Sequence, residues 1–114
     1  MKSENNALIS VIVPCFNSGK TISKTISSLK SQTWKNLEII IVNDGSTDEN
    51  TIRIINKFEN IKLINQKNLG LPAARNNGAK EAKGKFLFFL DSDDWIESDS
   101  LHLMYKFQKK IKKS

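Results

Sequence analysis

Leu37-Glu-Ile-Ile-Ile-Val42 is the stretch of sequence that decides the fold. Four consecutive β-branched residues, from Ile39 to Val42, leave no polar face on an extended segment, because successive side chains of a strand point to opposite sides. A strand that is apolar on both sides is typical of a parallel sheet with helices on both faces. Residues 37–42 therefore predict a central strand of such a sheet.

Apolar runs and helical spacings alternate on either side of this strand. Further strands are expected at residues 8–14, 61–64 and 86–90, and helices at residues 22 to about 32, 52 to about 59, 72–84 and from 98 onwards. Pro72 suits the first turn of the third helix, Gly84 is expected to end that helix, and Ser98 is expected to cap the fourth. The small side chains expected to bring the third helix close to the sheet are Ala73, Ala74, Ala79 and Ala82. The order βαβαβαβα predicts an α/β, Rossmann-like, three-layer α/β/α domain with a mainly parallel sheet of about four strands.

Length and composition limit the class of protein. The 114 residues predict one domain, and 39% hydrophobic with 26% charged residues is typical of a soluble globular protein. No apolar stretch approaches the roughly 20 residues of a membrane span, and the first residues do not resemble a signal peptide, so a cytoplasmic location is expected. Cys15 is the only cysteine and His102 the only histidine, which excludes an internal disulfide and a Cys-rich zinc cluster. His102 is expected to pack on a helix rather than to catalyse a reaction.

The net charge of +6 is concentrated near the C-terminus. The lysines of this region are Lys106, Lys109, Lys110, Lys112 and Lys113. A nucleic-acid surface usually distributes its basic residues along a groove with aromatic residues, so we expect no nucleic-acid partner. Two interpretations remain open: a solvated helix end that suits the helix dipole, and peripheral contact with an anionic membrane surface.

A short segment that contains polar residues follows each of the four predicted strands. These segments are Phe16-Asn17, then Asp44, then residues 67–70, and finally residues 91–94. Ligands of open parallel sheets bind beyond these carboxyl ends of the strands. Asp91 and Asp93, two residues apart on an extended backbone, are expected to point to one side and to hold a hard divalent cation, Mg²⁺ or Mn²⁺. The alternative is that these acids only begin a turn or cap a helix.

The chain lacks the glycine-rich loops that commonly bind nucleotide phosphates. Residues 14–19 contain one glycine rather than the G-x-G-x-x-G pattern, and Gly19-Lys20-Thr21 lacks the upstream glycine of a phosphate loop. A divalent cation on Asp91 and Asp93 would neutralise phosphate charge in another way.

Three more residues are candidates for ligand contact. Asp44 could accept a hydrogen bond from a nucleobase or a sugar hydroxyl, or it could simply form an Asp-Gly turn. Phe16 could stack on a base or pack under the edge of the sheet. Arg75 lies in the first turns of a helix, where a cation opposes the helix dipole, which indicates an anionic partner: Asp44, an aspartate of residues 91–94, or a phosphate.

Five segments of the chain together resemble one known family. They are Ser10-Val-Ile-Val-Pro-Cys-Phe-Asn17, Ser28-Leu-Lys-Ser-Gln-Thr33, Glu38-Ile-Ile-Ile-Val-Asn-Asp-Gly-Ser-Thr-Asp48, Asn68-Leu-Gly-Leu-Pro-Ala-Ala-Arg-Asn-Asn-Gly78 and Phe89-Leu-Asp-Ser-Asp-Asp94. In order and spacing, from about residue 8 to residue 105, they resemble the nucleotide-binding half of family 2 glycosyltransferases, which have the GT-A fold. Each segment alone is a weak signal, whereas the set of five is highly specific.

This resemblance implies a site for a nucleotide-diphosphate sugar, most often a UDP-sugar, in an inverting transferase. Pro14 and Phe16 match the segment that lines the nucleoside pocket, Asp44 matches the family aspartate that contacts the base, and Arg75 matches an arginine beside the base and diphosphate. The segment Asp91-Ser92-Asp93 is similar to the family's Asp-x-Asp motif. The resemblance thus implies that Asp91 and Ser92 lie on the nucleotide-sugar and that Asp93, with Asp91, binds a divalent metal.

The chain departs from the family pattern after Ser98. Family members normally continue for about another hundred residues, which carry the acceptor pocket and an acidic general base, so the base is expected beyond Ser114 and residues 1–114 are expected to be a truncated donor-binding domain. The acceptor implied is a saccharide or a lipid-linked saccharide of the cell envelope. The alternative function is a non-catalytic module whose uncovered sheet edge supports self-association as a homodimer or the binding of a partner.

Overall fold

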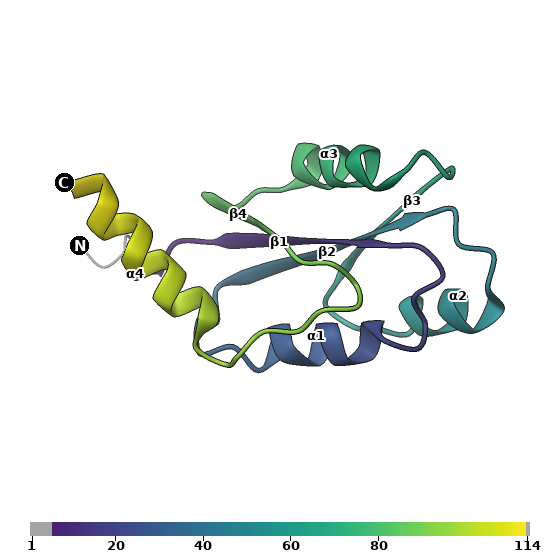
Figure 1. The fold of residues 1–114 in the computed structure, drawn as a ribbon, viewed down its shortest axis with the longest axis horizontal. Helices are drawn as coiled ribbons and strands as arrows, with labels where there is room; N and C mark the ends of the chain where they lie inside the picture. Colours follow the sequence, from purple (N-terminus) through teal and green to yellow (C-terminus); the bar gives the residue numbers. More distant parts are fainter. Residues whose placement is uncertain (1–5, 114) are drawn as a thin grey trace.

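The computed structural model describes the backbone of residues 6–113 and the side chains of residues 6–108. The elements are β1 (Ile9–Cys15), α1 (Ile22–Lys30), β2 (Leu37–Asp44), α2 (Glu49–Ile55), β3 (Lys62–Gln66), α3 (Leu71–Glu81), β4 (Phe86–Phe89) and α4 (Ser100–Lys113). Figure 1 shows α3 on one side of the sheet and α1 and α2 on the other. The predicted order and the three-layer α/β/α architecture are confirmed.

The sheet has the order β3-β2-β1-β4, and all of its neighbouring strands are parallel. β1 and β2 lie at its centre, paired from Ile9 with Leu37 to Cys15 with Asn43. The run that predicted the fold is buried on both faces, as expected. Ile39 and Ile41 pack into the cluster on the α1 side, whereas Ile40 and Val42 pack into the cluster that contains Ala74 of α3.

Helices α1 and α3 approach the sheet in different ways. On α1 the predicted apolar face, Ile22, Ile26 and Leu29, is fully or almost fully buried. On α3 the contact is made by small residues, as expected, and the tightest point is Gly78, where an added Cβ would lie 2.5 Å from a side-chain carbon of Ile12. The backbone of α3 at Gly78 therefore packs directly on the side chains of Ile12 and Val42, with no side chain of the helix between them.

Two of the predicted helix boundaries are wrong. Gly84 does not end α3, because the helix stops at Glu81 and Ala82 is already extended. The amide of Gly84 instead donates to the hydroxyl of Ser10, and an added Cβ would lie 2.5 Å from that same oxygen, so the glycine permits close approach to β1. Ser98 does not cap α4, because the helix begins at Ser100. The carbonyl of Ser98 accepts a hydrogen bond from the amide of Thr33.

Other boundaries shift by a few residues. α2 ends at Ile55 rather than near residue 59, and Asn60 then adopts a left-handed conformation with φ of 61°. β2 extends two residues further than expected, to Asp44. Hydrophobic spacing marks where apolar side chains recur, whereas the last turn of a helix depends on hydrogen bonds that this spacing does not show.

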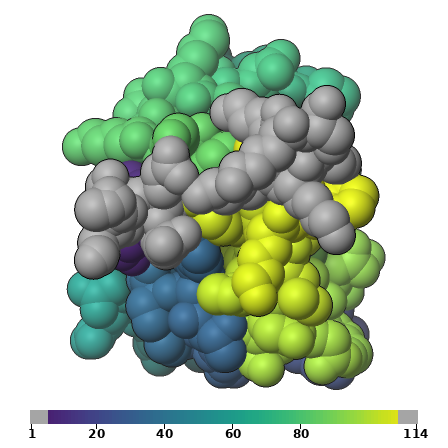
Figure 2. All heavy atoms as spheres, turned by 90° about the vertical axis from the view of Figure 1, so that its left-hand side faces the viewer, coloured from purple at the N-terminus to yellow at the C-terminus, as the bar shows by residue number. Residues whose placement is uncertain are grey.

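The aromatic residues at the end of the molecule link α4 to the rest of the domain. Trp34 stacks on Tyr105 with ring centroids 4.7 Å apart and lies 5.7 Å from His102, which gives the only histidine a packing role. Figure 2 shows the described part of α4, in yellow, beside a segment whose blue colour corresponds to about residues 30–40. No helix among residues 6–113 is long and apolar enough to cross a membrane. The side chains of the lysines from residue 109 onwards lie outside the described residues, so the expected membrane contact stays a prediction.

Substitution of Gly78 by alanine should destabilise the domain by about 1–3 kcal/mol, because overpacking a tight contact forces the backbone or its neighbours to shift. The shift would push α3 away from Ile12, where an added Cβ would lie 2.5 Å from a methyl carbon. Urea denaturation followed by circular dichroism measures the effect, and Asn76→Ala, at an exposed position of the same helix, serves as the control. Equal stability of the Gly78 variant and the wild type would contradict the close packing of α3.

Candidate functional site

A cleft opens where β4 stops beside β1. β4 ends at Phe89, opposite Ile12, and the last hydrogen bond between the strands runs from the amide of Leu90 to the carbonyl of Ile12 at 3.0 Å. β1 continues for three more residues, and Pro14 has no N–H to donate towards β4. The chain order of the strands also reverses at this point, and ligands of open parallel sheets bind at such a switch point.

The cleft has a volume of about 640 Å³. The described residues that line it are Pro14, Phe16, Asn17, Ser18, Thr21, Asp44, Asn68, Gly70, Leu71, Asp91, Ser92 and Asp93. Six of the seven residues predicted to bind ligand or metal are therefore brought together. The seventh, Arg75, does not line the cleft but lies at its border, where its guanidinium forms an ion pair of 3.3 Å with Asp91.

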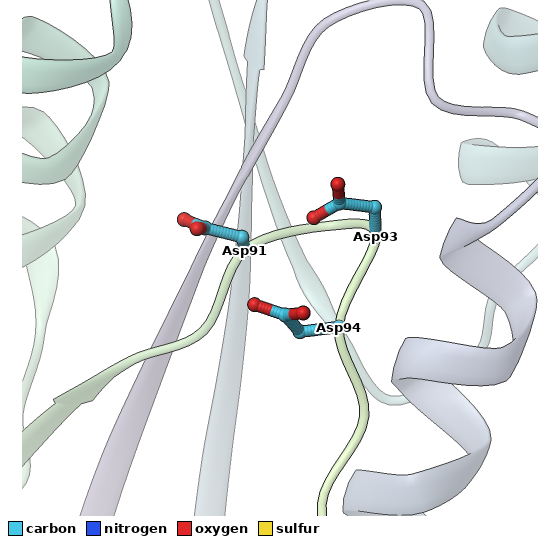
Figure 3. A group of neighbouring side chains, drawn as sticks. All are labelled: Asp91, Asp93 and Asp94. Carbon is cyan, nitrogen blue, oxygen red and sulfur yellow. The ribbon is translucent and has the colours of Figure 1, made fainter.

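The three aspartates that follow β4 form a compact acidic group. One carboxylate oxygen from each of Asp91, Asp93 and Asp94 lies within 4.8 Å of the others, and all three side chains are exposed. Figure 3 shows them on the loop that leaves β4, with the carboxylates of Asp93 and Asp94 turned back towards Asp91. Oxygen donors at this separation suit a hard divalent cation such as Mg²⁺ or Mn²⁺.

The prediction that Asp91 and Asp93 converge because they alternate along an extended backbone is wrong. Residues 91–94 are not extended but form a tight turn, closed by a hydrogen bond of 3.0 Å from the amide of Asp94 to the carbonyl of Asp91. The turn adds Asp94 to the acidic group, which the alternation of side chains along a strand did not predict. Ser92 points away from Asp91 and Asp93: its side chain is buried, and its hydroxyl donates to the hydroxyl of Ser18 at 2.6 Å.

Arg75 forms an ion pair with one of the three anionic partners expected for it. It pairs with Asp91, and both side chains are exposed enough, at 37% and 52%, for the pair to contribute little to folding stability. The guanidinium of Arg75 beside Asp91 reduces the electrostatic repulsion among the three aspartates. Its N–H groups can also donate hydrogen bonds to another anion.

Asp44 is occupied by the protein itself. Its side chain is buried, and Oδ1 accepts hydrogen bonds from the side chain of Gln66 at 2.9 Å and the amide of Leu69 at 2.7 Å. Among the described residues, Oδ2 accepts only from the amide of Gly70, at 3.1 Å. Burial raises the pKa of Asp44, but the hydrogen bonds from Gln66, Leu69 and Gly70 outweigh it and hold that pKa below its usual value. An ionised carboxylate thus fastens the loop after β3 and keeps capacity on Oδ2 for a further donor.

Two residues after β1 shape the opposite wall of the cleft. Phe16 is 43% exposed and lines the cleft, so the expectation that it might pack under the sheet edge is wrong. Asn17 adopts a left-handed conformation, with φ of 52°, and its side-chain oxygen accepts hydrogen bonds from the amides of Thr47 and Asp48, both at 2.9 Å. Asn17 therefore ties the loop after β1 to the loop after β2.

A row of polar residues along one side of α1 and just beyond its two ends was not expected from the sequence. Thr21, Thr25, Ser28 and Gln32, here called the polar stripe, contact the segment that follows β4. Gln32 is fully buried and joins the carbonyl of Glu97 to the amide of Leu101. The signal was present: the positions are separated by four, three and four residues, the same spacing that was used to find the apolar face of the helix.

The comparisons with known proteins agree with this geometry. The family model described as glycosyl transferase family 2 matches residues 10–114. The chain belongs to glycosyl transferase family 2. The resemblance found in the sequence is thereby confirmed, and the domain is part of a family of transferases.

Individual relatives of this family 2 domain are considerably longer than the chain. It is 45% identical over 102 residues to glycosyltransferase GlyA of Streptococcus pneumoniae, covering 86% of this chain but 14% of that protein. It is also 45% identical to the UDP-Glc:alpha-D-GlcNAc-diphosphoundecaprenol beta-1,3-glucosyltransferase WfaP of Escherichia coli, covering 85% of this chain and 41% of the relative. The crystal structure of S. aureus TarS 1-349 in complex with UDP is 37% identical, with a TM-score of 0.81, and covers 90% of this chain and 32% of that one.

Substitution of Asp44 by asparagine should destabilise the family 2 domain by about 1–3 kcal/mol at pH 7, because an amide group would face the amide of Gly70. The folded pKa of Asp44 is below its ordinary value of 3.8, so the ionised form stabilises the fold above pH 3.8 and this contribution is lost as the pH falls through the folded pKa. The stability difference between wild type and variant should therefore shrink between pH 7 and pH 3. Urea denaturation at both pH values measures it, with Glu97→Gln, at an exposed position, as the control. A difference that is independent of pH would contradict the role given to the charge.

Proposed function

We propose that this domain is the donor-binding part of an inverting glycosyltransferase. The enzyme would transfer a sugar from a nucleotide-diphosphate sugar of the UDP type to an acceptor hydroxyl. The single observation that carries the proposal is the acidic group at one end of a cleft whose other wall is built from Phe16 and the loop fastened by Asp44. The similar TarS structures contain UDP and UDP-GlcNAc, which supports the UDP type.

The residues of the cleft divide into a nucleoside part and a diphosphate part. Pro14 and Phe16 offer apolar surface to the nucleoside, and Oδ2 of Asp44 has capacity to accept an N–H of the base. Asp91 and Asp93 would hold a divalent cation, Mg²⁺ or Mn²⁺, which when bound supplies positive charge to the leaving diphosphate. Arg75 lies beside Asp91 and would turn its guanidinium to phosphate oxygens. Ser92 contributes by its contact with Ser18, which fixes the loop between the two aspartates.

The charge of the cleft argues for a cation. Among the described residues that line it, three are aspartates, Asp44, Asp91 and Asp93, and none is lysine or arginine. A diphosphate that entered this cleft alone would be repelled by carboxylates on both sides. Binding of the nucleotide should therefore depend on a divalent cation, which removes this repulsion.

The acceptor side of the reaction needs a carboxylate to take the proton of the acceptor hydroxyl. Asp44 is occupied by backbone amides, and Asp91 and Asp93 are assigned to the cation, so we propose no general base among these three residues. The acceptor proposed is a saccharide or a lipid-linked saccharide of the cell envelope. The acceptor of WfaP, an alpha-D-GlcNAc-diphosphoundecaprenol, supports the lipid-linked type. We propose a cytoplasmic location at the inner face of the membrane, with the lysine-rich end of α4 towards anionic lipid.

A second candidate function is self-association through β4. This strand is at the edge of the sheet, and Leu87 and Phe89 on one of its faces are 46% and 42% exposed. Exposed edge strands with apolar side chains pair readily with other strands, so a homodimer or a complex with a partner is the alternative use of this domain.

Calorimetric titration of the domain with UDP should show binding in the presence of Mn²⁺ and little binding when the metal is removed by a chelator. Asp93→Asn should weaken the Mn²⁺-dependent binding more than tenfold, because losing even an indirect contact to a metal site commonly costs that much. Glu59→Gln removes an exposed carboxylate far along the chain from the acidic group and should leave binding unchanged.

Absence of heat with UDP and Mn²⁺ would count against the donor-binding function. Sedimentation analysis of the same samples then separates the two candidates, because a dimer that dissociates on Phe89→Lys would favour the module that self-associates. A monomer that binds UDP with Mn²⁺ supports the donor site alone.

A further inference from the structure

A buried hydroxyl on α1 forms hydrogen bonds with the turn that carries the acidic group. Thr25, in the middle of α1, is fully buried. Its hydroxyl oxygen lies 3.0 Å from the carbonyl oxygen of Ser92 and 2.5 Å from the carbonyl oxygen of Asp94. These are the two carbonyls on either side of Asp93 in the chain.

The chemistry of a hydroxyl makes this contact specific. Thr25 has one O–H proton, which the carbonyl oxygens of Ser92 and Asp94 share. Thr21 donates to the carbonyl of Ser92 as well, at 2.9 Å, but it is exposed and can exchange this bond for one with water. Asp94 has only the Thr25 hydroxyl as a described partner for its carbonyl, so Thr25 alone spans the turn.

The helix that carries Thr25 is itself rigidly placed. Its neighbours Ile22, Ile26 and Leu29 are buried in the core, so the hydroxyl is presented from an element that cannot easily move. The aspartate side chains, in contrast, are exposed, and no described contact with the core fixes Asp93 itself. The position of Asp93 relative to Asp91 and Asp94 is therefore set through its backbone, and that backbone is held by Thr25.

We propose that Thr25 is a positioning residue for the divalent cation: by binding the carbonyls of Ser92 and Asp94 it holds the carboxylates of the turn at the separation that a cation requires. This inference rests on the proposed function, because it concerns the same metal site. It assigns the geometry of the site to helix α1 rather than to strand β4, from which the aspartates follow in sequence. Contacts behind the ligands of a metal commonly change its affinity by 10- to 100-fold.

The test is the affinity of the whole domain for Mn²⁺, measured from the electron paramagnetic resonance signal of the free ion, with no substrate present. Thr25→Val keeps the shape of the side chain but removes the donor, and it should weaken Mn²⁺ binding by about 10-fold or more. Thr25→Ser restores the hydroxyl without the methyl group and should return the affinity to within about threefold of the wild type. Ser28→Ala is the matched control: the Ser28 hydroxyl donates to the backbone carbonyl of Thr25 within the helix and accepts from the amide of Ile96, but it makes no described contact with residues 91–94. This variant should leave the affinity unchanged.

Circular dichroism at each step shows whether a variant is folded. Should Thr25→Val fail to fold, Thr25→Cys keeps a side chain of similar size with a weaker donor, and it should weaken Mn²⁺ binding to an intermediate degree. An unchanged Mn²⁺ affinity in the folded Thr25→Val variant, or in Thr25→Cys when the former is unfolded, would overturn the proposal.

The outcome also separates this inference from the proposed function. When wild type binds Mn²⁺, Asp93→Asn does not, and Thr25→Val binds as the wild type does, only the positioning role is wrong. When wild type and Asp93→Asn bind Mn²⁺ equally weakly, the metal site itself is wrong and both proposals fail.

Discussion

The early end of β4 against β1 is the constraint on which the site depends. Backbone pairing between β4 and β1 stops at Leu90, whereas β1 continues to Cys15. The chain after β4 therefore leaves the sheet before β1 ends, and the cleft lies beside the last residues of β1. The loops after β1, β2 and β3 are tied together around this space by Asn17 and Asp44. The polar stripe of α1 fixes the fourth side, where the acidic turn lies.

The arrangement also explains how a protein can collect negative charge at one place and remain folded. Asp44 is buried but surrounded by donors, so its charge is stabilised by the fold. Asp91, Asp93 and Asp94 are exposed to water, which screens their mutual repulsion at low cost. The fold therefore remains stable with an acidic cleft that holds no cation, whereas a diphosphate in the same cleft would be repelled by the carboxylates. This difference is the physical basis of the metal-dependent binding proposed above.

The sequence alone predicted those features that depend on the pattern of side chains. The Ile39 to Val42 run gave the buried central strand, and the position of Asp91 and Asp93 after a strand brought them to the cleft. What could not be predicted depends on hydrogen bonds between distant segments. The carbonyls of the turn at residues 91–94 accept from the hydroxyl of Thr25, and the short α3 is followed by a close contact of Gly84 with Ser10. The spacing of the polar stripe shows that its residues share one side of a helix, but it does not show that Thr25 is buried, because a buried threonine and a solvent-facing one look the same in the sequence.

The most direct test of the central claim is a ¹⁵N–¹H correlation spectrum of the domain, recorded with small additions of Mn²⁺ and then with UDP. Paramagnetic broadening should appear first at the amides of residues 91–94, and UDP should then shift the amides of Asn17, Leu69 and Gly70 only when a divalent cation is present. Broadening that begins at other acids, such as Glu97 or Asp99, or UDP shifts that are the same without a cation, would contradict the account.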